Sequence, residues 1–124
     1  MKRITQEELE VFLRKHKLWL ENKKGGERAD LSGADLSEAD LSGANLSGAD
    51  LDYSCLSLWC GSLKANFDDK QLIQIAYHLV KAGLNSNNAS NETKTELAKL
   101  INFANKFHRV EECKKIEYEV QNDG

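Results

Sequence analysis

Long apolar runs are missing from this 124-residue sequence. A membrane-spanning helix needs about 20 predominantly apolar residues, and a secretion leader needs a shorter apolar segment behind a basic start. The chain begins Met1-Lys2-Arg3 but has no apolar segment after it, and no run approaches the length of a membrane span. We therefore expect a soluble, cytoplasmic protein without a membrane partner.

Common catalytic and nucleotide-binding motifs are also missing. The sequence has neither a GxxxxGK[ST] loop nor a GxGxxG loop, the two glycine-rich motifs that hold nucleotide phosphates. The three cysteines, Cys55, Cys60 and Cys113, are odd in number and lack paired CxxC spacing. This favours reduced thiols over a disulfide framework. We expect no cofactor and no catalytic residues.

Basic residues are missing from the middle of the chain. Residues 29–63 contain six acidic and no basic side chains, whereas residues 1–28 contain eight basic and five acidic ones and residues 64–124 contain nine of each. The formal net charge of −3 thus hides an acidic segment, and we expect an acidic face formed by Asp30, Asp35, Asp40 and Asp50. Such a face would repel phosphates, so direct nucleic-acid binding is not expected.

The acidic segment has a five-residue period between Arg28 and Tyr53, where the sequence reads RADLSGADLSEADLSGANLSGADLDY. Leucine and alanine each recur at every fifth position: Leu31, Leu36, Leu41, Leu46 and Leu51, and Ala29, Ala34, Ala39, Ala44 and Ala49. A helix would carry such residues around its axis, and a strand would send alternate leucines to opposite faces. The period instead indicates a solenoid whose neighbouring coils bury a shared core.

This segment resembles the pentapeptide-repeat family, whose motif is a small residue, Asp or Asn, Leu or Phe, a small polar residue and then any residue. The resemblance implies a right-handed quadrilateral β-helix with four pentads per coil and with the alanines and leucines pointing inward. It also implies turns at the serines and an outward direction for the residues that precede the leucines, namely Asp30, Asp35, Asp40, Asn45 and Asp50.

The regular period ends at Leu56, and the next pentad, Ala65-Asn66-Phe67, is shifted by one residue. Where the β-helix ends after Leu56 is left open. Six to eight pentads make about one and a half to two coils, or roughly 10 Å of solenoid. Family members that inhibit DNA gyrase imitate duplex DNA with a long acidic rod, and one turn of DNA is about 34 Å long. DNA mimicry by a single copy is therefore disfavoured.

A helix is predicted on the N-terminal side of the repeats. Thr5-Gln6-Glu7-Glu8 matches a capping box, in which the Thr and Glu side chains bond free amides of the first turn. Apolar residues follow at helical spacing over residues 6–21: Leu9, Phe12, Leu13, His16, Trp19 and Leu20. We expect this stripe to pack against the rest of the protein.

Two further helices are predicted after the repeats. Asp68 would cap the first and Gly83 would end it, with an apolar stripe of Leu72, Ile75, Ala76 and Leu79. A second capping box at Thr93–Glu96 begins a helix that continues to about Arg109. Beyond it, Ile116, Tyr118 and Val120 alternate with polar residues, as in a short strand or an extended arm.

The predicted fold is α+β: a short quadrilateral β-helix with an N-terminal helix and a C-terminal two-helix lobe, divided into residues 1–24, 25–67 and 68–124. A core of two coils is too small to be stable alone, so the helices should complete it. Exposed edges at a solenoid end invite pairing, and we expect a homodimer. Whether the chain's own helix or a second copy covers the open end is left open.

Candidate binding residues lie after the repeats. Aromatic and cationic groups that could hold nucleotide rings and phosphates are Trp59, Tyr77, His78, His108 and Arg109. His108 projects onto the apolar stripe of its helix, so we expect it to be buried and hydrogen-bonded to Glu111 or Glu112. The simpler alternative is that the aromatic residues belong to the core and Arg109 is solvated.

Two metal sites are conceivable from residue types. His108, Glu111 and Glu112 would converge if their helix continued. Tetrahedral zinc could be held by Cys60, His78, His108 and Cys113, although their spacing matches no zinc-finger pattern. For both sets we favour a role in the fold without a metal, so we expect no bound metal.

The pattern as a whole favours a non-enzymatic binding protein. The segments LWCGSL, YHLV and FHRVEEC and the Gly-Gly start of the repeats look like small pentapeptide-repeat proteins of phages and prophages. We therefore expect a phage or prophage protein that binds and blocks a host protein, such as a component of anti-phage defence. The alternatives are a binder that sequesters a small nucleotide signal, a DNA-mimic inhibitor of a DNA-binding enzyme, and a metal-dependent hydrolase.

Overall fold

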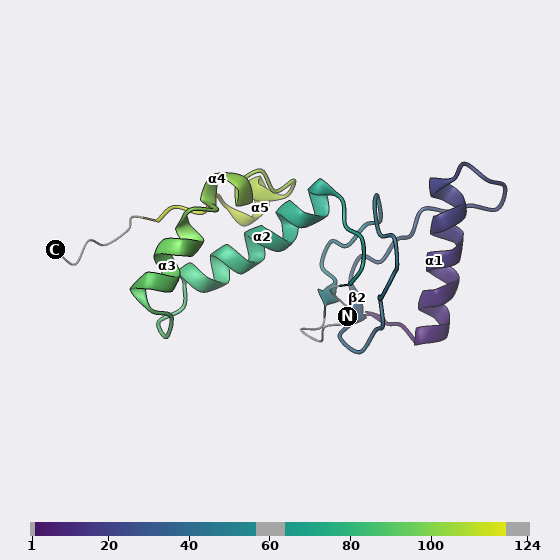
Figure 1. Ribbon diagram of the computed structural model, residues 1–124, viewed down its shortest axis with the longest axis horizontal. Helices are drawn as coiled ribbons and strands as arrows, with labels where there is room; N and C mark the ends of the chain where they lie inside the picture. The colour runs from purple at the N-terminus through teal and green to yellow at the C-terminus, as the bar shows by residue number, and fades with distance from the viewer. Residues whose placement is uncertain (1, 57–63, 119–124) are drawn as a thin grey trace. The chain divides into compact units, whose positions relative to one another are not determined.

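The computed structural model describes residues 2–56 and 64–118, and the chain divides into two units, residues 1–68 and residues 69–124 (Figure 1). The first unit contains β1 (Lys2–Arg3), α1 (Gln6–Leu20), β2 (Ala34–Leu36) and β3 (Cys55–Leu56). The second contains α2 (Asp69–Leu84), α3 (Asn91–Ala98), α4 (Ile101–Ala104) and α5 (Val110–Cys113). The chain thus mixes helices with a small sheet, and none of its described helices is long and apolar enough to cross a membrane.

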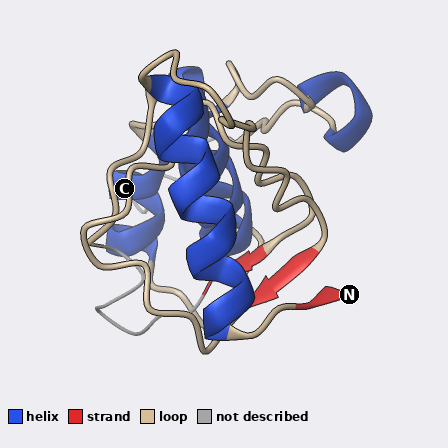
Figure 2. Ribbon diagram, turned by 90° about the vertical axis from the view of Figure 1, so that its right-hand side faces the viewer, coloured by secondary structure: helices blue, strands red, loops and turns tan. Residues whose placement is uncertain are grey.

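The repeats pair with themselves at a constant separation. β1, β2 and β3 form a parallel three-stranded sheet in that order, visible as the strands beside α1 in Figure 2. Asp35 pairs with Cys55, and an isolated parallel bridge joins Asp30 to Asp50. Both pairings join residues 20 apart, which is the length of four five-residue repeats.

The predicted one-residue shift in the period is confirmed by a third pairing. Asn45 bridges to Asn66, a separation of 21 residues. The Asn66 amide donates to the Ala44 carbonyl at 2.7 Å, and the Leu46 amide donates to the Asn66 carbonyl at 2.9 Å. The pentad at Ala65 therefore continues the stack despite the shift. The segment between the two frames, residues 57–63, lies outside the described residues.

The core of the first unit consists of the residues that the period places inward. The leucines of five successive repeats are buried, and Ala29, Ala34 and Ala49 are buried beside them. Leu9 of α1 joins this cluster, and Phe12 and Leu13 pack against it. The inward direction predicted for the leucines is thus confirmed, and α1 contributes to the same core.

The helix α1 begins at the predicted capping box. The Thr5 hydroxyl accepts a hydrogen bond from the Glu8 amide at 3.1 Å, and a Glu8 carboxylate oxygen accepts one from the Thr5 amide at 3.3 Å. These bonds satisfy two amides that a helix start otherwise leaves unpaired. At the other end of α1, Gly26 lies so close that an added Cβ would be 2.4 Å from the Trp19 backbone nitrogen. A side chain at residue 26 would therefore displace the turn after α1.

Three N-terminal elements bond the free edge of the first coil. β1 pairs with β2 along one segment. Along the following repeat, the Gln6 side-chain amide donates to the Asp40 carbonyl at 3.1 Å and accepts from the Asp40 amide at 3.0 Å. The His16 ring bonds the Ser47 carbonyl at 2.7 Å and the Ala29 amide at 3.0 Å. The chain's own N-terminal segment therefore covers this end of the repeats.

His16 is fully buried, and both ring nitrogens are used. Because the Ala29 amide is a donor, Nδ1 must act as the acceptor, and Nε2 then carries the hydrogen that it donates to Ser47. The His16 ring is therefore held as one neutral tautomer. Trp19 stacks on it with ring centroids 5.3 Å apart.

The buried face of α2 differs from the predicted stripe. Tyr77, Val80 and Leu84 are buried, whereas Leu72 and Leu79 are 44% and 54% exposed. Apolar residues occur on more than one side of this helix, so helical spacing alone does not determine which side faces inward. The hydroxyl of Tyr77 lies 2.8 Å from the Cys113 carbonyl and 2.6 Å from the Lys114 carbonyl, and these partners orient the Tyr77 side of the helix toward the core.

The predicted role of Gly83 is wrong. α2 continues through Leu84, so Gly83 lies inside the helix and does not end it. A Cβ added at Gly83 would lie 2.1 Å from Cδ1 of Leu97. Gly83 therefore permits the close approach of α3 to α2, which lie side by side (Figure 1).

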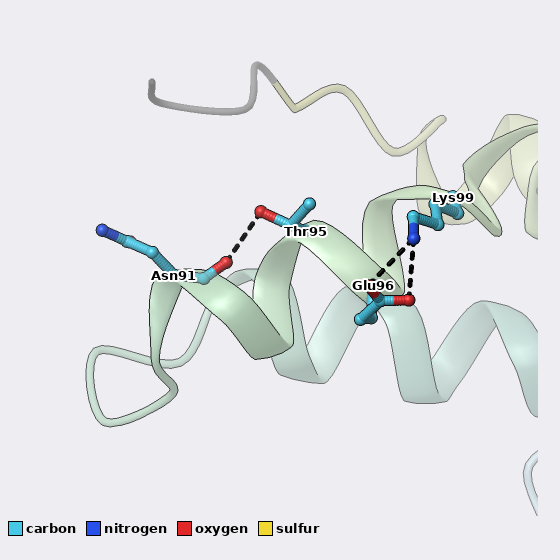
Figure 3. Close-up of polar contacts among 4 residues, drawn as sticks. All are labelled: Asn91, Thr95, Glu96 and Lys99. Atoms are coloured by element: carbon cyan, nitrogen blue, oxygen red, sulfur yellow. Dashed lines mark hydrogen bonds and ion pairs between the residues drawn. The ribbon is translucent and has the colours of Figure 1, made fainter. Parts of the chain in front are cut away.

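The helix predicted from Thr93 to about Arg109 is divided into shorter helices. Ser90 and not Thr93 is the N-cap of α3, because the Ser90 hydroxyl accepts from the Thr93 amide at 3.1 Å. Figure 3 shows two side-chain contacts within this segment: Thr95 donates to the Asn91 carbonyl at 2.8 Å, and Lys99 pairs with Glu96 at 2.9 Å. The chain turns at Lys99 and Leu100, which allows both α3 and α4 to pack against α2.

A side chain bonds the backbone of the segment after α5. The Asn105 amide group donates to the Ile116 carbonyl at 3.0 Å and accepts from the Ile116 amide at 2.8 Å. Ile116 is buried against the α2–α4 core. Residues 114–118 form no strand, and Lys114 has φ of +72°. The strand alternative is therefore not found in this part, whereas Val120 lies outside the described residues.

Replacing His16 with alanine should destabilise the first unit by about 2–4 kcal/mol, because the Ala29 amide and the Ser47 carbonyl would lose their partner in a buried place. Urea unfolding followed by circular dichroism measures this loss. Lys17→Ala is the matched control, since its exposed side chain should contribute within about 0.5 kcal/mol. Equal unfolding midpoints for the two variants would contradict the role given to His16.

Candidate functional site

The acidic residues of the repeats are held by a repeated turn. Each side chain before a leucine accepts a hydrogen bond from the backbone amide two residues later: Asp30 from Ser32, Asp35 from Ser37, Asp40 from Ser42, Asn45 from Ser47 and Asp50 from Asp52, at 2.9–3.1 Å. This is the Asx turn, which Asp and Asn form equally well. Four of these turns carry a charge, and Asp30, Asp35, Asp40 and Asp50 are the acidic turns.

Hydrogen bonds within two of the acidic turns lower the pKa of the aspartate. Hydrogen bonds from the Ser37 side chain and backbone lower the pKa of Asp35 below its ordinary value of 3.8. The backbone and side chain of Ser42 lower the pKa of Asp40 in the same way. Both carboxylates therefore stay ionised to lower pH than an ordinary aspartate does.

The acidic turns do not form one row. Asp30 and Asp50 are bridge partners, but Asp35 pairs with Cys55, and Asp40 lies on the following repeat. Asp30 and Asp40 are exposed, and Asp35 and Asp50 are half-buried. The negative charge therefore follows the coil from one segment to the next, whereas a single flat face would need all four residues to be stacked.

A shallow polar hollow lies where the N-terminal segment meets the second and third pentads. Its volume is about 380 Å³, and it is lined by Arg3, Ile4, Thr5, Gln6, Asp35, Ser37, Glu38 and Ala39. The guanidinium of Arg3 contributes to lowering the pKa of Asp35. Charges of both signs are thus close together, and the hollow does not select an anion or a cation by charge alone.

In the second unit, several of the predicted binding residues come together around Phe107. The ring centroids of Tyr77 and His78 lie 4.7 Å and 5.5 Å from that of Phe107, and the centroid of His108 lies 4.9 Å from it. Tyr77 and Phe107 are buried, whereas His78 and His108 are exposed. Three of the predicted residues, Tyr77, His78 and His108, are therefore close in space, because each contacts the ring of Phe107.

His108 is exposed, so the prediction that it is buried was wrong. Phe107, which helical spacing also places on that stripe, is buried as expected, and the break between α3 and α4 leaves the neighbouring His108 exposed. Glu112 forms an ion pair with Arg109, whose Nη2 lies 2.5 Å from a Glu112 oxygen, and the hydrogen bond expected between His108 and Glu111 or Glu112 stays a prediction. Arg109 is therefore held by a carboxylate of its own chain.

Burial of part of its ring lowers the pKa of His78 below the ordinary value of 6.5, and the charge of Lys81 lowers it further. The ammonium group of Lys81 is itself hydrogen-bonded. Its ammonium donates to the Cys113 carbonyl at 2.8 Å and to the Tyr77 hydroxyl at 3.1 Å, and it lies 5.4 Å from the centre of the Tyr77 ring. These contacts tie α2 to the end of α5.

The metal alternatives receive no support from this geometry. Among residues 2–56 and 64–118, no three His, Cys, Asp or Glu side chains lie close enough together to hold an ion. His108, Glu111 and Glu112 therefore do not converge. The second set includes Cys60, which, like the predicted binding residue Trp59, lies outside the described residues.

Two residues with a clear role were not predicted as such. His16 was assigned only to an apolar stripe, and Gln6 only to a capping box, yet both bond the free edge of the first coil. The role of His16 could have been predicted. Its position within an apolar stripe indicates burial, and a buried imidazole needs hydrogen-bond partners. The role of Gln6 had no such signal, since it depends on the placement of Asp40.

The repeats match a known protein family. Residues 27–58, about a quarter of the chain, match a protein-family model described as pentapeptide repeats (8 copies). No curated protein and no solved structure matches this chain. The matched span begins two residues before the first buried alanine, Ala29, and includes all of the acidic turns.

The lowered pKa of His78 predicts a pH dependence of the second unit. The unfolded chain takes up the proton near pH 6.5, and the folded chain takes it up only at lower pH. Stability is therefore fully present above pH 6.5 and decreases as the pH falls toward the folded pKa. Thermal unfolding on both sides of this pH measures the effect.

Two variants isolate the histidine responsible. His78→Gln should reduce the loss of stability in acid, and His108→Gln, which changes an exposed histidine on the same ring cluster, should leave it unchanged. If both variants retain the full pH dependence, His78 is not its source.

Proposed function

This chain is a pentapeptide-repeat protein, and we propose that it acts by binding another protein through its acidic turns, without catalysing a reaction. The observation that carries the proposal is the charge of the repeats. Residues 29–63 contain six acidic side chains and no basic one, and hydrogen bonds of the Asx turns lower the pKa of Asp35 and Asp40. Arg3 and Lys64 lie near Asp35 and Asp40, but the acidic side chains are in excess, and a surface with an excess of one sign steers and binds a partner of the opposite sign.

We further propose that the repeats wind as a right-handed quadrilateral β-helix with four pentads per coil. Pairings between residues 20 apart support this winding, because each coil then contains four pentads. The acidic turns would occupy successive sides of the coil. A partner could then approach from more than one side, which suits a concave basic surface better than a flat one.

The partner that we propose is a host protein with a basic surface, in keeping with the resemblance of the chain to phage and prophage members of the family. Imitation of DNA by one copy is less well supported. Three parallel strands in a row span two strand spacings, about 10 Å, and one turn of DNA is about 34 Å long.

Sequestration of a nucleotide signal is also less well supported. Of the cations near the Phe107 cluster, Lys81 binds the Cys113 carbonyl and Arg109 binds Glu112. A phosphate would have to displace these contacts. The homodimer expected from free solenoid edges stays a prediction, but the N-terminal segment already covers the first coil, so a second copy would have to use another surface.

Asparagine at the acidic turns provides a direct test. The combined variant Asp30→Asn, Asp35→Asn, Asp40→Asn and Asp50→Asn changes the formal net charge from −3 to +1. The turns should be retained, since Asn45 accepts the same bond from Ser47 at 3.1 Å. We expect unchanged thermal unfolding and loss of partner capture from host lysate, and capture by the unaltered protein should weaken with added salt.

Asn45→Asp is the matched control, because it adds a negative charge at the same repeat position. It should retain or strengthen capture. A captured protein that binds the four-asparagine variant as tightly as the unaltered chain would contradict binding through the acidic turns.

A further inference from the structure

The N-terminal segment takes a shorter path than the coil that it covers. Arg3 pairs with Asp35, and the Gln6 side chain bonds both backbone groups of Asp40. Between these two contacts the N-terminal segment advances three residues, from 3 to 6, while the repeats advance five, from 35 to 40. The turn of the coil between the contacts is therefore left uncovered. The polar hollow lies at this turn, because residues 3–6, 35 and 37–39 line it.

Glu38 carries a charge at the uncovered turn. It occupies the last position of its pentad, where the neighbouring repeats have Gly33 and Gly43. Its side chain is exposed and lines the hollow. Within residues 2–56 and 64–118, no hydrogen bond or ion pair joins the Glu38 carboxylate to another group. The carboxylate is therefore available to a ligand that enters the hollow.

Arg3 supplies a charge of the opposite sign from β1. The pKa of Asp35 is lowered mainly by hydrogen bonds from Ser37 and to a smaller extent by the charge of Arg3. Asp35 is thus bonded within its own Asx turn and attracts Arg3 without pairing with it. In the described part of the chain, the exposed Arg3 side chain forms no hydrogen bond or ion pair. Its guanidinium donors are therefore available to another carboxylate.

The size and lining of the hollow define the class of ligand. Its volume of about 380 Å³ lies at the small end of ligand pockets, which span about 300–1,000 Å³. Ile4 and Ala39, which pack against the core of the first unit, add an apolar part to the lining. A small zwitterion matches these features. Its carboxylate accepts hydrogen bonds from a guanidinium, its ammonium donates to a carboxylate, and an apolar side chain contacts Ile4 and Ala39.

We propose that the hollow binds a free α-amino acid with a small apolar side chain. Arg3 holds its carboxylate, and Glu38 holds its ammonium group. The site does not depend on the proposed protein partner, since neither Arg3 nor Glu38 belongs to the acidic turns. Binding is weak, with a Kd of about 1 mM, because exposed ion pairs contribute little free energy.

Three probes with the same side chain test the proposal: valine, valinamide, which lacks the carboxylate, and N-acetylvaline, which lacks the ammonium group. Each is titrated into the ¹⁵N-labelled full chain, and the amide signals are followed by NMR. Valine should shift the signals of residues 3–6 and 35–39. Valinamide and N-acetylvaline should each bind at least about tenfold more weakly, because each loses one of the two charge-assisted contacts.

Two variants assign the two contacts. Arg3→Gln and Glu38→Gln should each weaken valine binding by about tenfold. Arg3→Gln should leave the affinity for valinamide unchanged, and Glu38→Gln should leave the affinity for N-acetylvaline unchanged. The matched controls are Arg14→Gln and Glu10→Gln, which change exposed residues of α1 outside the hollow and should retain valine binding.

The probe series decides the question on the unaltered chain, even if a variant were to lose its fold. Equal affinity for the three probes would overturn the inference, because the hollow would then not recognise both charges. Absence of any shift at about 50 mM valine, far above the expected Kd, would overturn it as well. Unchanged valine binding by folded Arg3→Gln and Glu38→Gln would show that these residues do not hold the ligand. None of these results would affect protein binding through the acidic turns.

Discussion

The first unit depends on how the free edge of its first coil is hydrogen-bonded. Every coil of a solenoid presents backbone amides and carbonyls toward the next coil, and the first coil has no predecessor. Backbone groups that are buried without a partner cost about 1–3 kcal/mol each, so the edge must be bonded. Here a two-residue strand, the Gln6 side chain and the His16 ring supply donors and acceptors. The α1 helix holds two of these groups in position while Leu9 fills the core between them.

Much of the first unit could be predicted from sequence because its pattern is local and repeated. The leucines, the shift at Ala65 and the Thr5 capping box each follow from spacing within a few residues, and the structure confirms them. The winding with 20 residues per coil came from the family resemblance, since spacing alone indicates a solenoid without its number of sides. The bonds of His16 and Gln6 depend on residues about 30 positions away and have no local signal.

The second unit was harder to predict because its sequence has no repeat. α2 has apolar residues around much of its circumference, and the buried side is selected by the Tyr77 hydroxyl and its partners near Cys113. The break between α3 and α4 places Phe107 inward and His108 outward, which reversed the predicted environment of His108. The candidate residues nevertheless lie together, because Tyr77 and His78 on α2 face Phe107 after α4. The backbone of Lys114 has φ of +72°, and the spacing of residues in the sequence does not predict this left-handed conformation.

The position of the capping segment has a consequence for biosynthesis. The ribosome delivers residues 2–20 before the repeats, so α1 leaves the exit tunnel with Leu9 and His16 still lacking their partners. Those partners arrive in the first coil, between Ala29 and Ser47. The free edge of the first coil is therefore made next to the segment that covers it, and the interval in which this edge could pair with another nascent chain is short.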